Sequence, residues 1–224
     1  MAVKYYVGRD SQKQPWPPDF NHETHATIGI IKRLWQAFNR EKDLFAIVVN
    51  LHRPSADMVI ISKRGLGVVE LKHYPGRIFQ KPDGTWCAGS TPIKAGAKSQ
   101  GYRNPHEQVQ AYAKRIRRAL ILSRKQPPLL PGDSTDWERF KFQTAVCFTH
   151  PSAIIEDFKE ALRHRQRPKT EKWEEFKVRK PDEMPEWTTT LRFEASMGHE
   201  HDYEPHCLTA EQIMNIATRL LHGT

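Results

Sequence analysis

Two carboxylates and one lysine are the residues of this sequence whose types and spacing best suit chemistry. Asp57 begins one apolar run, and Glu70 and Lys72 interrupt a second, GVVELKHY, that otherwise has the pattern of a buried strand. Ionised side chains are rare in such segments unless they are paired or bind an ion. Two carboxylates provide the oxygen ligands that Mg²⁺ prefers, and a lysine beside them can bind a phosphate or position an attacking water.

The segments that carry these three residues are expected to form one antiparallel hairpin. Residues 57–62 and 66–74 both have strand character, and the Lys-Arg-Gly between them suits a short turn. Alternate residues of a strand share a face, so Glu70 and Lys72 are expected on the same face. If the numbers of paired residues sum to an odd value of about 127–129, Asp57 joins that face, whereas an even sum or a bulge would separate it.

The same residues also fit an interpretation without chemistry, in which they form a cross-strand ion pair on a solvated sheet face. The pattern Asp…Glu-x-Lys alone does not separate the two interpretations. Two helices on either side of the hairpin favour the functional one. The first has Asn21 as its N-cap and a predicted apolar face formed by Ile28, Ile31, Leu34, Trp35 and Phe38.

Glu23 falls on the inward face of that first helix by its spacing, although a carboxylate in a first turn also suits the helix dipole. The second helix spans residues 104–122 and begins with Asn104 as N-cap and Pro105 in its first turn. Gln108 is expected to face inward. The apolar stripe of this helix is predicted to consist of Val109, Tyr112, Ile116 and Leu120.

The remaining chain is expected to complete an α/β fold with a mixed central sheet flanked by helices. Predicted strands lie at 44–51, at 140–150 and at 188–195, a hairpin surrounds the Lys-Pro-Asp-Gly turn at 81–84, and an amphipathic helix covers 209–221. The charged, proline-containing segment 159–187 is predicted to be an exposed elaboration.

Composition limits the class of protein. The chain has 224 residues, of which 38% are hydrophobic, which is enough for one domain with a sizeable core. Its net charge of +9 favours a polyanionic partner, with nucleic acid ahead of a membrane surface. Three widely spaced cysteines, no signal-peptide pattern and no apolar run long enough to span a bilayer indicate a soluble cytoplasmic protein.

At this point the sequence resembles a known family. ADMVIISKRGLGVVELKHYPG followed by GYRNPHEQVQAY is similar to the NERD (nuclease-related) domain of the PD-(D/E)xK, restriction-endonuclease-like superfamily. The resemblance covers about residues 20–150, and 188–221 would complete a single domain of residues 1–224. It rests on the spacing D-x12-E-x-K and on N-P-x-x-Q in the next helix, with Ala56-Asp57 in place of the Pro-Asp pair.

The resemblance implies a restriction-endonuclease-like fold and a set of site residues. Asp57 and Glu70 would be metal ligands, joined by Glu23, and Lys72 would act on the attacking water or on the phosphate. Gln108 would lie beside them. Mg²⁺, or Mn²⁺ in its place, would be the cofactor.

The function implied is metal-dependent hydrolysis of phosphodiester bonds in nucleic acid, with DNA favoured over RNA. Arg53 and Arg103 are candidates for contacts with phosphate groups. A partner such as a helicase, in cis or in trans, and self-association through helix 209–221 are both compatible with this class. The alternative from another class is a non-catalytic module that binds nucleic acid and recruits a partner protein.

Overall fold

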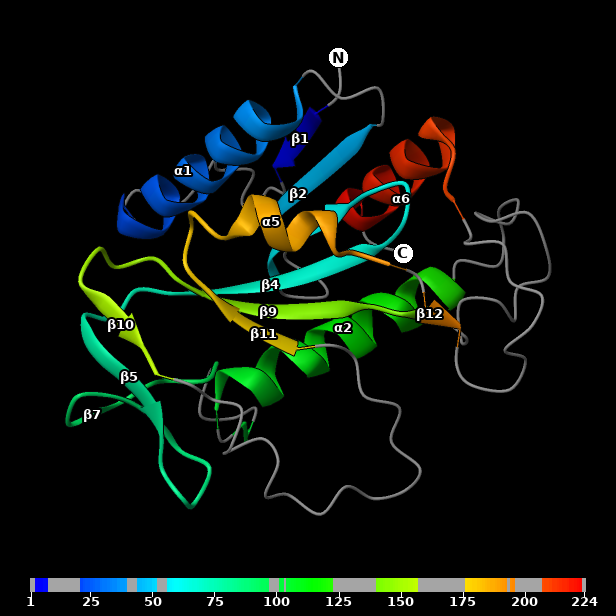
Figure 1. The fold of residues 1–224 in the computed structure, drawn as a ribbon. Coiled ribbons are helices and arrows are strands. Elements are labelled where there is room, and N and C mark those ends of the chain that lie inside the picture. Colours follow the sequence, from blue (N-terminus) through cyan, green and yellow to red (C-terminus); the bar gives the residue numbers. More distant parts are fainter. Residues whose placement is uncertain are drawn as a thin grey trace.

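A six-stranded mixed sheet forms the centre of the structure (Figure 1), which is a computed structural model. It describes residues 3–7, 21–39, 44–51, 56–96, 101–102, 104–122, 140–156, 176–192, 194–195 and 207–222. The strands lie in the order β1-β2-β3-β4-β9-β11. Their bounds are Val3–Val7 for β1, Phe45–Leu51 for β2, Ala56–Ile61 for β3, Leu66–Lys72 for β4, Gln143–Phe148 for β9 and Phe176–Arg179 for β11.

The sheet is antiparallel in its middle and parallel towards both edges. β3 pairs antiparallel with both β2 and β4, whereas β1–β2, β4–β9 and β9–β11 are parallel pairs. Parallel neighbours need a crossover connection, and the chain between β4 and β9 includes the helix α2, Pro105–Leu122. The prediction of an α/β fold with a mixed sheet flanked by helices is therefore confirmed.

Helices cover both faces of this sheet. One face packs against α1, Asn21–Phe38, and α5, Met184–Thr189. The other packs against α2 and α6, Ala210–His222. A sheet that is buried on both faces needs apolar residues at successive positions, which explains the nearly continuous apolar runs of β2, β3 and β4.

Strand alternation divides β4 between these two cores. Val68 belongs to the core beneath α2, and Val69 and Leu71 belong to the core beneath α1. Glu70 and Lys72 have the parity of Val68, so they share one face of β4, as predicted, and the structure shows that α2 packs on this face.

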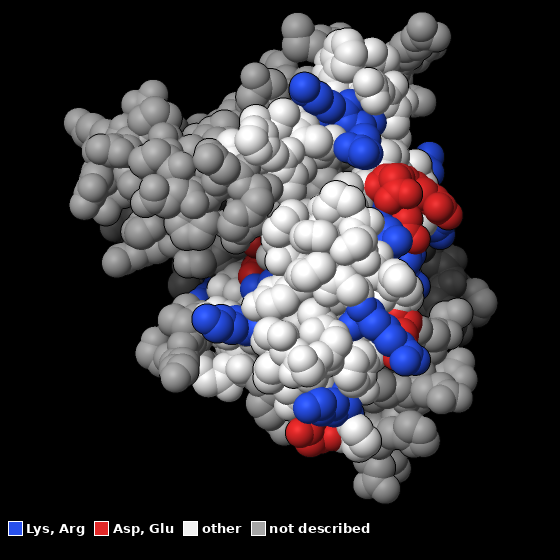
Figure 2. Space-filling view, turned by 90° about the vertical axis from the view of Figure 1, so that its left-hand side faces the viewer, with Lys and Arg blue, Asp and Glu red and all other residues white. Residues whose placement is uncertain are grey.

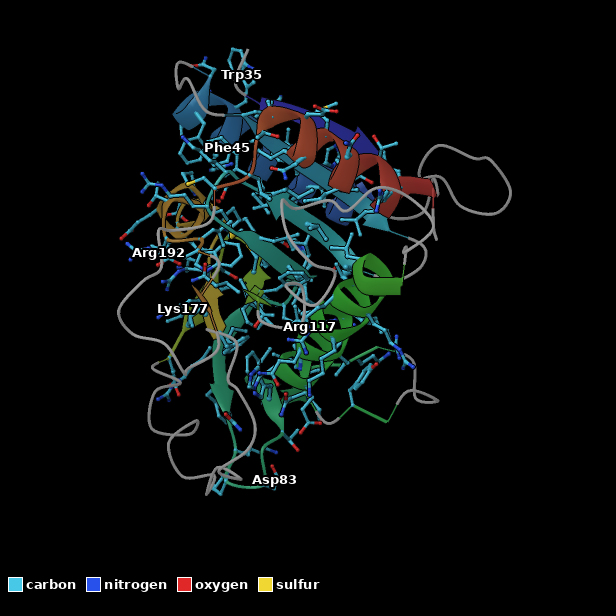
Figure 3. The ribbon with its side chains drawn as sticks, turned by 90° about the vertical axis from the view of Figure 1, so that its right-hand side faces the viewer. Trp35, Phe45, Asp83, Arg117, Lys177 and Arg192 are labelled. Atoms are coloured by element: carbon cyan, nitrogen blue, oxygen red, sulfur yellow. The ribbon has the colours of Figure 1, made fainter. Side chains whose placement is uncertain are left out.

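A second, four-stranded sheet follows directly after β4. Its order is β10-β5-β6-β7, and β5 and β6 form the expected antiparallel hairpin. In Figure 3 its turn, which carries Asp83, projects at the end of the molecule opposite to Trp35 of α1. The bounds are Gly76–Gln80 for β5, Trp86–Ala88 for β6, Thr91–Pro92 for β7 and Ala153–Ile155 for β10, and two short strands, β8 (Phe140–Lys141) and β12 (Glu194–Ala195), pair separately.

The structure corrects the prediction that residues 159–187 form an exposed elaboration. Within the described part of that segment, Phe176–Arg179 is strand β11 of the central sheet. Met184 and Trp187 of α5 are also buried, at 0% and 1% exposure. The segment was predicted to be exposed because most of its residues are charged, and its few buried apolar residues do not stand out in the sequence. Of the strand expected at 188–195, the described residues form Glu194–Ala195, and the first two positions of that range belong to α5, which continues to Thr189.

The apolar face of α1 is narrower than its sequence suggests. Ile30, Leu34 and Phe38 are buried, whereas Ile28 is 39% and Trp35 51% exposed. A helix that packs on one sheet buries one stripe, so apolar residues beside that stripe remain in solvent. The strand β1 has no counterpart in the sequence analysis. Among the described residues, no helix combines the length and the apolar character that a membrane span needs.

Candidate active site

The hairpin of β3 and β4 brings the three candidate residues together. Its pairs, such as Met58 with Val69, have numbers that sum to 127, so Asp57 is opposite Glu70 in this register. The odd sum is the one that puts Asp57 on the face of Glu70 and Lys72. The structure therefore selects the register that sequence reasoning had left open.

These side chains are held by short, specific contacts. Lys72 Nζ donates to Glu70 Oε1 at 2.7 Å, and the backbone N–H of Leu71 donates to Asp57 Oδ2 at 2.7 Å. Glu70 is only 3% exposed, and the side chain of Lys72 is 12% exposed. The ion pair is thus largely shielded from water, which strengthens it compared with a pair on a solvated sheet face.

Helix α2 begins beside this cluster and is fixed by its N-cap. Asn104 Oδ1 accepts from the backbone N–H of Glu107 at 3.0 Å, and Asn104 Nδ2 donates to the Gly84 carbonyl of the β5–β6 turn at 2.9 Å. The predicted cap is therefore confirmed, and the same side chain joins the helix to the second sheet. Both contacts fix the start of α2, where Gln108 lies one turn in.

Gln108 is buried, as predicted, and it contacts a residue that sequence reasoning had assigned to the apolar stripe. Its Nε2 donates to the hydroxyl of Tyr112 at 2.9 Å, one helical turn further on. Within the described part of the chain, Gln108 Oε1 is buried without a hydrogen-bond partner. A buried amide oxygen in that state favours a donor supplied by a ligand or water.

The pKa of Tyr112 shows that this pair lies within electrostatic reach of the carboxylates. The pKa of Tyr112 is raised to about 12, mainly by burial and in smaller part by the negative charges of Glu70 and Asp57, against the opposing hydrogen bond from Gln108. The ring of Tyr102 packs edge-on against Tyr112 at 6.3 Å. The only sequence signal for Tyr112 as a site residue was its position four residues after Gln108, on the same helix face.

Parallel strands β4 and β9 end side by side next to the cluster. The backbone N–H of Thr149 donates to the Lys72 carbonyl at 2.9 Å, and the rings of His73 and His150 lie 4.8 Å apart. Figure 2 views the molecule from the side on which these strands end. Lys and Arg side chains are scattered there around a broad uncharged area, with a few acidic side chains among them. The carboxyl ends of parallel strands are where α/β sheets commonly place their sites.

Three predicted residues are not placed by the structure. The side chain of Glu23 and the whole of Arg53 and Arg103 lie outside the described residues. Helix α1, which contains Glu23, packs on the face of the sheet opposite to Glu70. A contact between Glu23 and the carboxylates would therefore have to pass the edge of the sheet, and its assignment as a ligand stays a prediction.

The donor set around Asp57 and Glu70 fits a hard cation. The described residues include no group of three or more His, Cys, Asp or Glu side chains arranged for a metal. From this hairpin the carboxylates available to a cation are those of Asp57 and Glu70. Mg²⁺ usually keeps several waters and binds one or two carboxylates together with substrate phosphate, so two ligands of this type suffice.

Comparison with known proteins agrees with this geometry. Residues 28–149, more than half of the chain, match the family model of the NERD, or nuclease-related, domain. The matched range includes α2 and both strands of the β3–β4 hairpin. No curated protein and no solved structure matches the chain. On the strength of the family match, the chain belongs to the nuclease-related domain family.

Proposed function

We propose that this protein is a metal-dependent nuclease that hydrolyses phosphodiester bonds of nucleic acid, with DNA as the favoured substrate. One observation carries the proposal. In a chain of the nuclease-related family, two carboxylates and a lysine lie on the same face of two paired strands, with Glu70 and Lys72 in contact.

Asp57 and Glu70 are the residues that would hold Mg²⁺ or Mn²⁺. A bound divalent cation would supply positive charge next to the phosphate and lower the pKa of a coordinated water. Lys72 Nζ lies 2.7 Å from the Glu70 carboxylate and holds that side chain in place. When phosphate enters, the same ammonium group can shift to a phosphate oxygen, since a lysine has three donors on a flexible stem.

Gln108 and Tyr112 provide polar groups on helix α2, which packs on the same face of the sheet as Glu70. The amide of Gln108 is held by the Tyr112 hydroxyl, and with its raised pKa that hydroxyl stays protonated throughout the physiological range. Gln108 therefore presents its carbonyl oxygen in a fixed orientation, suited to accept a hydrogen bond from a water or from the substrate.

Affinity for nucleic acid would come from contacts between positive charges and phosphate groups rather than from hydrogen bonds to base edges. The chain carries 35 Lys and Arg against 26 Asp and Glu, which favours salt-sensitive contacts with phosphates. Arg53 and Arg103 remain the proposed phosphate contacts. These contacts would carry little sequence specificity. We also propose a cytoplasmic location for the protein.

The test compares wild type with Lys72→Ala on supercoiled plasmid, linear duplex DNA, single-stranded DNA and RNA. Each substrate is incubated with Mg²⁺, with Mn²⁺ and with EDTA. Cleavage that needs metal and Lys72 supports the proposal and identifies the substrate. Binding without cleavage by both proteins would favour the alternative, a module that recruits a partner such as a helicase.

A further inference from the structure

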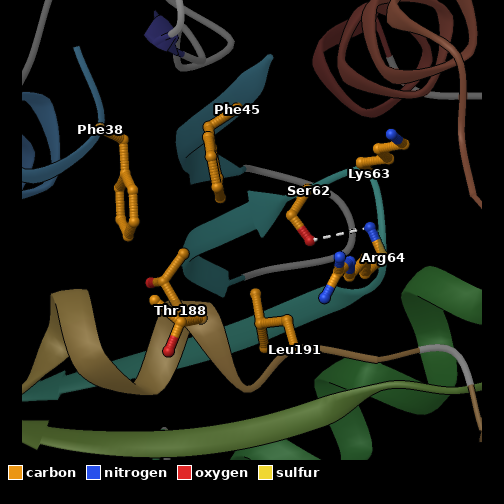
Figure 4. A pocket seen from close by; sticks show the side chains of 8 residues that line it. Phe38, Phe45, Ser62, Lys63, Arg64, Thr188 and Leu191 are labelled. Carbon is orange, nitrogen blue, oxygen red and sulfur yellow. Dashed lines mark hydrogen bonds between the residues drawn. The ribbon is translucent and has the colours of Figure 1, made fainter. Parts of the chain in front are cut away.

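A hollow of about 240 Å³ opens at the turn end of the β3–β4 hairpin, on the α1 and α5 side of the sheet (Figure 4). Ser62 at this end is five residues from Asp57 at the other. At about 3.3 Å per residue the hollow lies roughly 16 Å from the carboxylates, and it opens on the opposite face. It is lined by Phe38, Phe45, Ser62, Lys63, Arg64, Thr188, Thr189 and Leu191.

One wall of the hollow is aromatic. The rings of Phe38 and Phe45 stack at a centroid distance of 4.4 Å and an angle of 18°. Figure 4 shows these rings on one side and the turn with Arg64 on the other, above Leu191. Leu191 is buried and completes the apolar floor. The faces that the two rings turn to each other are occupied by this stack, so an aromatic ligand would contact the parts of the pair that line the hollow, since aromatic rings pack edge-to-face as well as stacked.

The turn that carries Arg64 is rigid. The Ser62 hydroxyl donates to the Gly65 carbonyl and accepts from the backbone N–H groups of Arg64 and Gly65, at 3.0–3.3 Å. A Cβ on Gly65 would lie 2.4 Å from the backbone nitrogen of Arg192, so the turn is pressed against the chain that follows α5. Because the backbone of this turn is already ordered, a ligand that binds to Arg64 would lose little free energy in ordering it.

The polar lining of the hollow favours an anion. Among the described residues that line it, the charged ones are Lys63 and Arg64, and none is acidic. The hydroxyls of Thr188 and Thr189 donate to carbonyls of their own helix, at 2.8 Å and 2.7 Å. In Figure 4 the Arg64 side chain extends towards the hollow and that of Lys63 points away from it. The guanidinium group, with its planar fork of donors, is therefore the group placed to bind a phosphate.

We propose that this hollow binds a nucleobase carrying a phosphate, with the ring against Phe38 and Phe45 and the phosphate on Arg64. A volume of about 240 Å³ lies below the range of drug-sized pockets, so the base would enter and the sugar phosphate would remain at the mouth. Either a free nucleoside monophosphate or an unpaired terminal nucleotide of a strand has this chemistry. The inference does not rest on the proposed nuclease function, since the hollow lies on the other face of the sheet.

The test is calorimetric titration of the whole chain, in EDTA, with adenosine monophosphate, adenosine and ribose 5-phosphate. We expect the monophosphate to bind about tenfold more tightly than either half, because only it uses both the ring and the phosphate contact. Arg64→Gln should raise its Kd about tenfold and leave adenosine unchanged. Arg118→Gln, an exposed arginine of α2 on the other face, is the matched control and should have no effect.

Three results of these titrations would overturn the proposed nucleotide site. No binding of the monophosphate at millimolar concentration, equal effects of the two arginine variants, or equal affinity for ribose 5-phosphate would each overturn the proposal. Competition by a duplex with one unpaired 5′-adenylate, but not by a blunt duplex, would identify the strand end as the source. If neither duplex competes, the free nucleotide is the ligand of the hollow. If both duplexes compete equally, the hollow binds only the phosphate backbone, and the proposed contact between the base and the phenylalanine rings is overturned.

Discussion

Lys72 is expected to stabilise the fold as well as to serve the site, because its partner is buried. Lys72→Met removes the charge at 2.7 Å from Glu70 Oε1 and keeps most of the apolar stem. Removing one partner of a buried pair costs about 3–5 kcal/mol. Since the side chains of Lys72 and Glu70 are 12% and 5% exposed, we expect the lower end, about 3 kcal/mol.

A double-mutant cycle separates this pair from other effects. Urea unfolding in EDTA would be measured for wild type, Lys72→Met, Glu70→Gln and the double variant, and we expect a coupling energy of about 2 kcal/mol. The ion pair of Arg77 with Glu156 is the control. Arg77 is 74% exposed, so Arg77→Met should change stability by less than about 1 kcal/mol. A coupling between Lys72 and Glu70 below about 0.5 kcal/mol would refute the reasoning, since an exposed pair gives that value.

Three further substitutions, one of them with a control variant, test the packing around the central sheet by urea unfolding. Because the pKa of Tyr112 is raised from 10.0 to about 12, the hydroxyl keeps its proton to higher pH in the folded state than in the unfolded state. The free energy of unfolding should therefore fall as pH rises from about 10 to 12, and Tyr112→Phe should reduce that fall. Identical pH profiles for the two proteins would contradict the raised pKa. Gly67→Ala would bring a Cβ to 2.6 Å from Trp187 Cη2 and should cost about 1–3 kcal/mol. Gly29→Ala in α1, where a Cβ would meet only the end of the Arg33 side chain at 3.4 Å, should be neutral or stabilising, and equal effects of the two variants would contradict the packing at Gly67. Asn104→Ala removes the α2 cap and the bond to the β5–β6 turn and should cost about 2 kcal/mol, with a loss under about 0.5 kcal/mol counting against the cap.

The sequence was most informative where local chemistry and periodicity agree. The β3–β4 hairpin, the Asn104 cap of α2 and the shared face of Glu70 and Lys72 follow from short-range patterns: turn residues, capping residues and strand alternation. The family was accessible because D-x12-E-x-K and N-P-x-x-Q are local motifs. Within this hairpin the register of Asp57 needed the structure, since one residue of slip would have moved its side chain to the other face.

What the sequence did not predict depends on long-range packing. Strand β11 has few apolar residues and is recognisable only by its pairing with β9. Trp35 matches the apolar spacing of α1 but lies outside the stripe that the sheet covers. Tyr112 has the spacing of a core residue, and its proximity to Glu70 arises from the way α2 crosses the sheet. Helix spacing alone does not distinguish a core residue from one that lines a site.

The most direct test of the central claim is the cleavage rate of the variants on the substrate that the wild type cuts best in Mg²⁺. Asp57→Asn and Lys72→Ala would be compared with Arg118→Ala, at a temperature where unfolding curves show every protein folded. The account predicts that the first two lose about a hundredfold or more in rate while the third cuts like the wild type. Cleavage by Asp57→Asn and Lys72→Ala at the wild-type rate would contradict it, because the chemistry would then lie elsewhere than at the β3–β4 hairpin.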